Sequence, residues 1–316
     1  MSFTLGFDTS NYTTSCALFD VENKTAFSCK QLLPVKEGER GLRQSDAVFF
    51  HTRQMPLLIK KLFHDHCEKN IEAVGYSNVP RNVSGSYMPC FLVGENSAIC
   101  VSETMNIDAF KTSHQVGHVL AALYSCGRLD LLRKDDPFLA FHISGGTTDM
   151  LLCRADSEKV IDIKEIGTSL DLKAGQAVDR IGVRLGLSFP CGPQFEKLAL
   201  KSNATYKIKP TIKGLNCCLS GLENKCINMI NTGVTSFDVA KFCLDYIYET
   251  ICGMTNAAIN VYGNLPVVFA GGVMSNSIIK KRLSENTFDC YFSEPEFSCD
   301  NAVGVAVYAA VMKGLI

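Results

Sequence analysis

Phe138-Leu-Ala-Phe-His-Ile-Ser-Gly-Gly-Thr-Thr-Asp-Met-Leu-Leu152 is an apolar stretch, a turn of small and polar residues, and a second apolar stretch. The same order of residue types opens the chain, in Phe3-Thr-Leu-Gly-Phe-Asp-Thr-Ser-Asn-Tyr-Thr-Thr-Ser-Cys-Ala-Leu-Phe19. Both stretches predict two apolar strands joined by a tight turn, which is a β-hairpin. The repeat indicates that each half of the protein begins with the same element.

Helical patterns follow both hairpins. Apolar residues recur at helical spacing over Phe49–Phe63, Leu170–Leu187 and Phe237–Tyr262. A third strand and turn, Pro266–Asn276, precedes a basic helix over Ser277–Leu283. Strands that alternate with helices are typical of α/β proteins, so we predict two α/β domains that face each other across a cleft.

Two histidines stand out in the stretch that follows Lys111. His114 and His118 are four residues apart, which places both imidazoles on one face of a helix. Such a pair can share a metal ion, although a hydrogen-bonded pair without metal is the commoner use of this spacing. A zinc protease of the His-Glu-x-x-His type is disfavoured, because its general base would stand at position 115, and Gln115 cannot accept a proton.

Glycine turns after two of the strands suggest a phosphate site. Ser144-Gly145-Gly146 follows the strand of the second hairpin, and glycines let backbone amides approach a phosphate closely. Asn276 stands at a predicted helix start, where it can bind a ligand or only cap the helix. Asp300, before the last apolar helix, is open to the same two interpretations.

Composition limits the function classes. The chain has 316 residues, 47% of them hydrophobic, and 31 Lys and Arg against 32 Asp and Glu. The net charge of −1 gives no overall basic field, so any contact with RNA needs local patches or a partner. Because no signal peptide or apolar run of membrane-spanning length is visible, we expect a cytoplasmic protein with no membrane contact.

The fifteen cysteines are scattered, and no Cys-x-x-Cys pair occurs. This pattern argues against a zinc ribbon, a redox dithiol or an iron–sulfur cluster. We expect most of these thiols to fill the core.

The motifs, taken in order, resemble one family. The chain is similar to the TsaD-type tRNA threonylcarbamoyladenosine synthases of the actin and hexokinase-like (ASKHA) superfamily. The resemblance runs through the motifs that begin at Asp8, His114, Ser144, Asp171, Gly186, Leu219, Ala270 and Cys299. It implies an α/β, two-domain ASKHA fold with duplicated mixed sheets flanked by helices. The domains would cover residues 1–132 and 133–316, and the last helix could pack back on the first domain.

The resemblance also implies site residues. His114, His118 and Asp300 would bind one divalent metal ion, iron or zinc. Ser144, Gly145 and Gly146 would lie along the phosphate, with His142 and Ile143 leading into the turn. Asp179, Gly192 and Asn276 would hold the nucleoside of an adenine nucleotide or of threonylcarbamoyl-adenylate. We take Asp8 and Ser144 as candidate catalytic residues.

The implied activity is transfer of a threonylcarbamoyl group from threonylcarbamoyl-adenylate to N6 of adenosine 37 in tRNA. The resemblance further implies two protein partners, a paralogous TsaB-type protein that packs on the first-domain helices and a small TsaE-type ATPase. The helix Phe49–Phe63 would meet the first of them. We expect tRNA to bind weakly to the isolated chain.

The sequence departs from the family pattern at several positions. An acidic residue is replaced by Thr13, a glutamate by Gln176, a histidine by Thr147, and the Gly-Pro-Gly-Leu stretch by Val79–Gly85. A divergent paralogue with another acceptor, or a scaffold without turnover, is therefore an alternative. A phosphotransferase that holds magnesium on Asp8 is a third hypothesis, which the histidine pair disfavours.

Overall fold

The computed structural model describes residues 2–10, 12–34, 42–64, 70–298 and 302–316. Two compact units divide the chain. Unit 1 comprises Met1–Leu132, Asp156–Ile161 and Cys299–Ile316, and unit 2 comprises Arg133–Ala155 and Asp162–Ser298. The last helix therefore belongs to unit 1, as do six residues at the tip of a hairpin in the second half.

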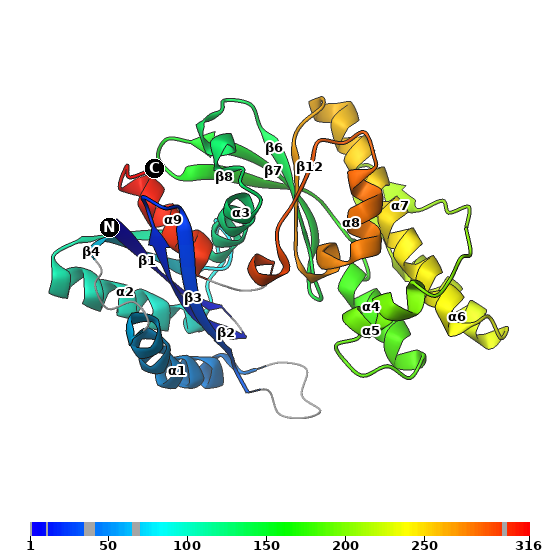
Figure 1. Cartoon of the computed structure of the whole chain (residues 1–316), viewed down its shortest axis with the longest axis horizontal. Coiled ribbons are helices and arrows are strands. Elements are labelled where there is room, and N and C mark those ends of the chain that lie inside the picture. Colours follow the sequence, from blue (N-terminus) through cyan, green and yellow to red (C-terminus); the bar gives the residue numbers. More distant parts are fainter. Residues whose placement is uncertain (1, 11, 35–41, 65–69, 299–301) are drawn as a thin grey trace. The chain divides into compact units, whose positions relative to one another are not determined.

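Unit 1 contains a five-stranded sheet in the order β3-β2-β1-β4-β5 (Figure 1). Strand β1 pairs antiparallel with β2 and parallel with β4, and β4 pairs parallel with β5. Its elements are β1 (Ser2–Ser10), β2 (Thr13–Asp20), β3 (Thr25–Leu32), α1 (Gln44–His64), β4 (Asn70–Val79), η1 (Pro89–Phe91), α2 (Leu92–Met105), β5 (Asp108–Ser113), α3 (His114–Ser125), η2 (Leu129–Arg133) and α9 (Val303–Met312).

Unit 2 repeats this arrangement, with a sheet in the order β12-β11-β6-β7-β8. Strand β6 pairs antiparallel with β7 and parallel with β11, which pairs parallel with β12. Its elements are β6 (Phe138–Ile143), β7 (Thr148–Asp156), β8 (Val160–Thr168), α4 (Ala174–Arg184), α5 (Gly192–Ala199), β9 (Thr211–Lys213), β10 (Asn216–Cys218), α6 (Ser220–Asn231), α7 (Ser236–Tyr262), β11 (Val267–Ala270), η3 (Gly272–Ser275), α8 (Ser277–Ser284), β12 (Cys290–Phe292) and η4 (Pro295–Phe297).

Both predicted hairpins are confirmed as β1–β2 and β6–β7, and with them the duplicated α/β architecture. Helices α1, α7 and α8 confirm three of the predicted helices. The helix predicted from Leu170 begins only at Ala174, so that boundary was wrong. The carboxylate of Asp171 accepts hydrogen bonds from the amides of Leu172, Leu219 and Ser220, which holds the chain outside the helix.

Helices α3 and α9 touch backbone to backbone in unit 1. A Cβ added at Gly304 of α9 would lie 1.8 Å from the carbonyl oxygen of Gly117 in α3. A Cβ added at Gly6 of β1 would lie 2.5 Å from the amide nitrogen of Ala306. Because these positions are glycine, α9 fits closely between the sheet and the helix that carries the two histidines.

The cysteines in the described ranges are all free thiols, and most of them are buried. Burial raises the pKa of Cys217 to about 11 and that of Cys290 to about 12, so both stay protonated at neutral pH. Among the helices of the described ranges, none has both the length and the apolar character needed to cross a bilayer.

Candidate functional site

Helix α3 brings the two histidines together. It begins at His114, where the side chain of Ser113 caps it by accepting a hydrogen bond from the amide of Val116. The Nε2 atoms of His114 and His118 are 2.9 Å apart, and the ring centroids are 4.3 Å apart. The Nε2 atoms of the two imidazoles therefore face each other.

Asp8 orients the first histidine from the neighbouring strand. Its carboxylate, fully buried on β1, lies 3.0 and 3.1 Å from the Nδ1 atom of His114. The hydroxyl of Ser77 on β4 donates to the same carboxylate. Asp8 is thus hydrogen-bonded inside the protein. It contacts the Nδ1 atom of His114, whereas His118 contacts the Nε2 atom.

These contacts fit a metal ligand pair. A carboxylate can only accept, so His114 donates from Nδ1 to Asp8 and presents a lone pair on Nε2. In this structure that lone pair accepts a hydrogen bond from the Nε2 atom of His118 at 2.9 Å, and a bound metal ion would take the place of the shared proton. Metal-binding histidines commonly have their second nitrogen held in this way by a carboxylate. Asp300, the expected third ligand, lies outside the described residues, and within those residues no cluster of three such side chains is found.

The predicted phosphate turn lies in unit 2, at the end of β6. The amide of Ser144 donates to the carbonyl of Thr147 at 2.9 Å, which closes the turn. A Cβ added at Gly145 or Gly146 would meet nothing within 4 Å, so the backbone of both residues faces open space. His142 is half-buried and Ile143 is buried in the strand that leads into this turn.

Two further glycines hold this turn against its neighbours. A Cβ added at Gly175, at the start of α4, would lie 2.5 Å from the carbonyl oxygen of Ser144. Gly271 follows β11 with φ of +101°, and a Cβ there would lie 2.3 Å from the carbonyl oxygen of Ile143. The ends of two adjacent parallel strands and the start of a helix therefore meet at Ser144–Gly146, an arrangement suited to binding phosphate.

A cavity of about 540 Å³ opens beside this turn. Its volume is in the range of small-molecule sites. The lining residues all belong to unit 2 and are Gly145, Gly175, Val178, Asp179, Phe189, Pro190, Gly192, Pro193, Glu196, Leu244, Gly272, Val273, Ser275, Asn276 and Pro295. Four of the predicted site residues are among them, whereas His142, Ile143, Ser144 and Gly146 are not.

Hydrogen bonds define what the polar residues of this cavity can offer. One carboxylate oxygen of Asp179 accepts from the amide of Cys191 at 2.8 Å. The side-chain oxygen of Asn276 accepts from the amides of Ile278 and Ile279, so Asn276 caps α8 as well as lining the cavity. Glu196, which sequence reasoning missed, accepts from the amide of Ser277 at 2.9 Å.

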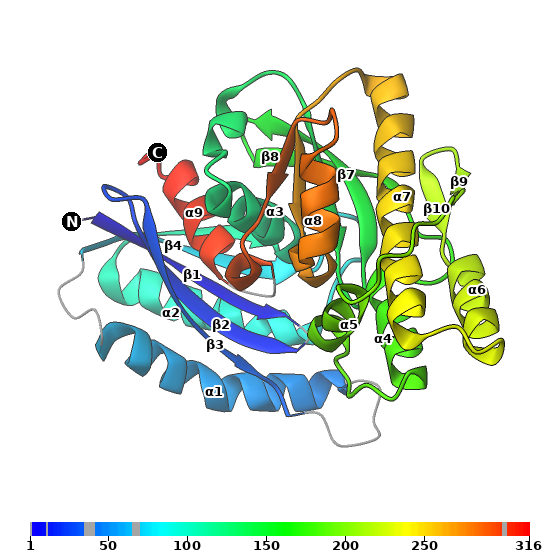
Figure 2. The ribbon, with the colours of Figure 1, turned by 45° about the vertical axis from the view of Figure 1, so that its right-hand side comes forward.

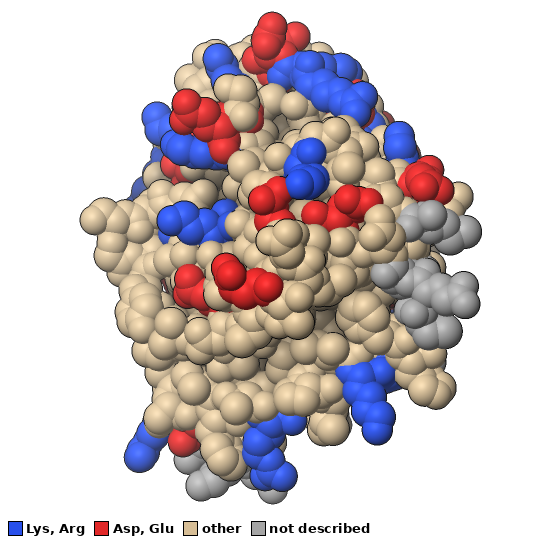
Figure 3. Space-filling model, turned by 90° about the vertical axis from the view of Figure 1, so that its left-hand side faces the viewer, with Lys and Arg blue, Asp and Glu red and all other residues tan. Residues whose placement is uncertain are grey.

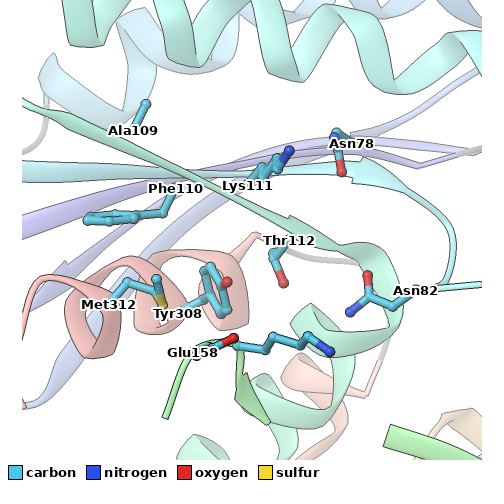
Figure 4. A pocket seen from close by; sticks show the side chains of 10 residues that line it. Asn78, Asn82, Ala109, Phe110, Lys111, Thr112, Glu158, Tyr308 and Met312 are labelled. Atoms are coloured by element: carbon cyan, nitrogen blue, oxygen red, sulfur yellow. The ribbon is translucent and has the colours of Figure 1, made fainter. Parts of the chain in front are cut away.

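A second cavity, of about 570 Å³, lies in unit 1 and contains none of the predicted site residues. Figure 4 shows Thr112 of β5 and Tyr308 of α9 on its wall, with Asn82 at one side. Burial raises the pKa of Tyr308, and a hydrogen bond with Thr112 partly offsets this effect. We place the candidate nucleotide site in the cavity of unit 2, because that cavity holds the glycine turn.

Comparisons with known proteins identify the family of this chain. The model of the TsaD family, described as tRNA N6-adenosine threonylcarbamoyltransferase, matches residues 39–307. A protein of that name from Kosmotoga olearia is 32% identical over 227 residues, which span 69% of this chain and 66% of that protein. One from Aromatoleum aromaticum is 27% identical over 322 residues, which span 97% of this chain and 90% of that protein.

Solved structures support the fold alone. Full-length HypF in its phosphate- and nucleotide-bound form has a TM-score of 0.61 at 12% identity, over 99% of this chain and 55% of that one. A ROK family glucokinase from Streptomyces griseus has a TM-score of 0.53 at 10% identity, over 98% of this chain and 99% of that one. These neighbours confirm the predicted ASKHA fold. With the family match over most of its length, the chain belongs to the tRNA N6-adenosine threonylcarbamoyltransferase family.

Proposed function

We propose that this chain transfers a threonylcarbamoyl group from threonylcarbamoyl-adenylate to N6 of adenosine 37 in tRNA. The observation that carries this proposal is the cavity in unit 2, where an open glycine turn and the family's nucleoside-binding positions line one space. Family membership supplies the transferase activity. The protein would act in the cytoplasm, where tRNA is modified.

The adenylate half of the donor fits the polar groups of this cavity. The amides of Gly145 and Gly146 can approach the phosphate, because no side chain shields them. The carboxylate of Asp179 has an oxygen available for ribose hydroxyls beyond the one that binds the amide of Cys191. For Asn276, the nitrogen of the amide remains as a donor once its oxygen caps α8.

The threonylcarbamoyl group passes directly from the donor to the acceptor, without a covalent bond to the enzyme. The exocyclic nitrogen of adenosine attacks the carbamoyl carbon, and the bond from that carbon to the phosphate oxygen breaks. AMP leaves with the electron pair, and the nitrogen releases one proton to the solvent. The amides of Gly145 and Gly146 would stabilise the charge that gathers on the leaving phosphate.

His114 and His118, with Asp300, would hold the divalent metal ion, which when bound supplies a Lewis acid for oxygen atoms of the donor. Asp8 would act as a positioning residue that keeps the Nε2 atom of His114 available. Asp300, which lies outside the described residues, is the third ligand of this proposal on the family resemblance alone. The choice between iron and zinc stays part of this proposal.

Protein partners are part of the proposal as well. Phe49 and Leu57 are 55% and 63% exposed on α1, although both are large and apolar. These residues support α1 as the contact for a TsaB-type partner, and a small TsaE-type ATPase would complete the system.

In Figure 3, basic and acidic side chains are interspersed on the face shown, which supports weak binding of tRNA by the isolated chain.

One observation favours a second candidate, a paralogue that binds nucleotide without turnover. Gln176, which replaces a family glutamate, accepts a hydrogen bond from the amide of Lys173 at 3.3 Å and so caps α4. Its side chain is a neutral amide, so Gln176 provides no base where a glutamate would. The phosphotransferase alternative is weaker, because the carboxylate of Asp8 is occupied by Ser77 and His114.

Metal analysis tests the metal site of unit 1, and ligand-induced stabilisation tests the nucleotide site of unit 2. We expect one equivalent of iron or zinc in the purified parent, and a substantial loss in His118→Ala. AMP and ATP should raise the melting temperature of the parent by mass action, and less so in Asp179→Asn. Equal metal in parent and His118→Ala would remove the metal assignment, and no thermal shift at millimolar nucleotide would remove the nucleotide assignment.

A further inference from the structure

The segment between α5 and α6 is basic and free of acids. Residues 197–222 contain no Asp or Glu, whereas the whole chain has a net charge of −1. The segment contains five lysines, namely Lys197, Lys201, Lys207, Lys209 and Lys213. This concentration of positive charge is not required by the nucleotide cavity, which none of the five lines.

Three of these lysines lie in residues 207–213, where exposed and partly buried residues alternate and the last three residues form β9. Ile208 and Ile212 are partly buried and pack against the core of unit 2. Lys207, Lys209 and Lys213 are exposed. Because successive side chains of an extended chain point to opposite sides, the three lysines share the outer side. We call these three residues the lysine ridge.

The core fixes the ridge in place. A Cβ added at Gly253 of α7 would lie 2.9 Å from the Cγ1 atom of Ile212, so the hairpin β9–β10 packs directly on that helix (Figure 2). The phenol of Tyr206 donates to the backbone carbonyl of Asp238 at 3.2 Å. The amide of Thr168 donates to the side chain of Asn216 at 2.9 Å. An anchored row of charges loses less conformational entropy on binding than a flexible one.

Two acids that act on Tyr206, the residue before the ridge, are already engaged. Asp238 accepts from the hydroxyls of Ser202 and Thr235. Asp245 forms salt bridges with Lys241 and with Arg282. Within the ranges that the structure describes, none of the salt bridges involves a lysine of the ridge. The ridge charges are therefore available to an external anion.

We propose that the lysine ridge binds the phosphate backbone of the tRNA acceptor. The inference rests on the proposed function and extends it to the surface that holds the RNA. In an extended chain, residues two positions apart are about 6.6 Å apart and residues four positions apart are about 13 Å apart. Lys207, Lys209 and Lys213 therefore match phosphates that are one and two steps apart along a nucleic-acid strand. Contacts of this kind position an RNA without reading its sequence, and they explain how a chain without an overall basic field can engage tRNA.

The test measures tRNA binding as a function of salt. The full chain, alone and with its TsaB-type and TsaE-type partners, is titrated with unmodified tRNA over a series of KCl concentrations. The ridge variant is Lys207→Gln/Lys209→Gln/Lys213→Gln. The control variant, Lys134→Gln/Lys164→Gln/Lys281→Gln, removes the same charge from exposed lysines elsewhere in unit 2. A third variant replaces the ridge lysines with arginine.

Each lost phosphate contact makes the negative slope of log K against log salt less steep by about 0.7 to 0.9, so the loss of three contacts in the ridge variant should reduce its steepness by about 2 to 3. The control should keep the parent slope, and the arginine variant should restore it. All variants should keep the parent melting temperature and its shift with AMP.

Three results would overturn the inference: equal slopes in ridge and control variants, no tRNA binding by the parent under any condition, or weaker partner binding with unchanged tRNA binding. Transfer is measured in the same samples. If the parent transfers the group and the ridge variant binds tRNA as the parent does, the proposed function stands and the role of the ridge is rejected. If the ridge variant loses tRNA binding but the parent shows no transfer, the role of the ridge stands and the proposed function is rejected.

Discussion

Single residues show why the sequence alone could not assign every role. Asn276 was equally compatible with capping and with ligand binding, and the structure shows that its oxygen caps α8 while the residue also lines the cavity. The carboxylate of Asp8 contacts Ser77, which is 69 positions away in sequence. Such long-range partners leave no local signal, whereas the spacing of His114 and His118 is local and was sufficient to predict their contact.

His51 is another residue whose state depends on partners far away in sequence. The amide nitrogen of Gln54 donates to the carbonyl of Leu32, so its oxygen faces Thr14 and accepts from the hydroxyl there at 2.6 Å. That hydroxyl can then only accept from the Nδ1 atom of His51, at 2.7 Å. The Nε2 atom of this buried ring consequently carries the lone pair, and it has no hydrogen-bond partner in the described part of the chain.

We predict that His51 makes the protein sensitive to mild acid. Burial lowers the pKa of His51 to about 4, an effect that the Ser10 carbonyl and the Asp8 charge partly offset. The unfolded chain takes up this proton near pH 6.5, so stability should fall as the pH drops from about 6.5 to about 4. The difference corresponds to about 3 kcal/mol.

Denaturant unfolding at a series of pH values measures this loss. In His51→Asn, the side-chain amide can keep the hydrogen bond to Thr14 without a titrating group. The parent should therefore lose more stability than this variant over the acid range. Parallel pH profiles for the two proteins would show that His51 is not the source.

At the scale of elements, periodicity predicted where helices lie better than where they begin. The helix predicted over Phe237–Tyr262 is observed as Ser236–Tyr262. The helix predicted from Leu170 fails at its start, because the side chain of Asp171 binds the amides of Leu219 and Ser220 near the start of α6. Helix ends depend on such side-chain contacts, which the apolar pattern does not encode.

Two glycine substitutions should separate packing from ligand contact at the phosphate turn. Gly175→Ala places a Cβ 2.5 Å from the carbonyl oxygen of Ser144, and overpacking of this kind costs about 1 to 3 kcal/mol. Gly145→Ala places its Cβ in open space on the ligand side of the turn. We expect a lower melting temperature for Gly175→Ala, but for Gly145→Ala we expect an unchanged melting temperature with weaker AMP binding.

Thermal unfolding with and without AMP distinguishes the two effects. If Gly145→Ala binds AMP as tightly as the parent, the phosphate does not lie along this turn. If Gly175→Ala unfolds at the parent temperature, the contact between α4 and the turn is looser than the structure indicates.

At the scale of the whole molecule, the sequence predicted the duplication because each hairpin is a local signal. The strand orders β3-β2-β1-β4-β5 and β8-β7-β6-β11-β12 show that the repeat extends to the complete sheets. Strands β4, β5 and β12 were not predicted, since they join their sheets through long-range parallel pairing. The division of unit 1 into three stretches of chain was not predicted for the same reason, because it depends on contacts between segments that are distant in sequence.

The most direct test of the central claim is the mass of the acceptor nucleoside. Threonylcarbamoyl-adenylate, metal and unmodified tRNA are incubated with the chain and with the partner proteins of its own cell, and the tRNA is then digested to nucleosides. We predict that adenosine 37 gains the mass of a threonylcarbamoyl group, that omission of the partners strongly reduces the product, and that His118→Ala forms little of it. Unmodified adenosine 37 in the complete reaction, with nucleotide and metal bound, would contradict the account and favour the paralogue without turnover.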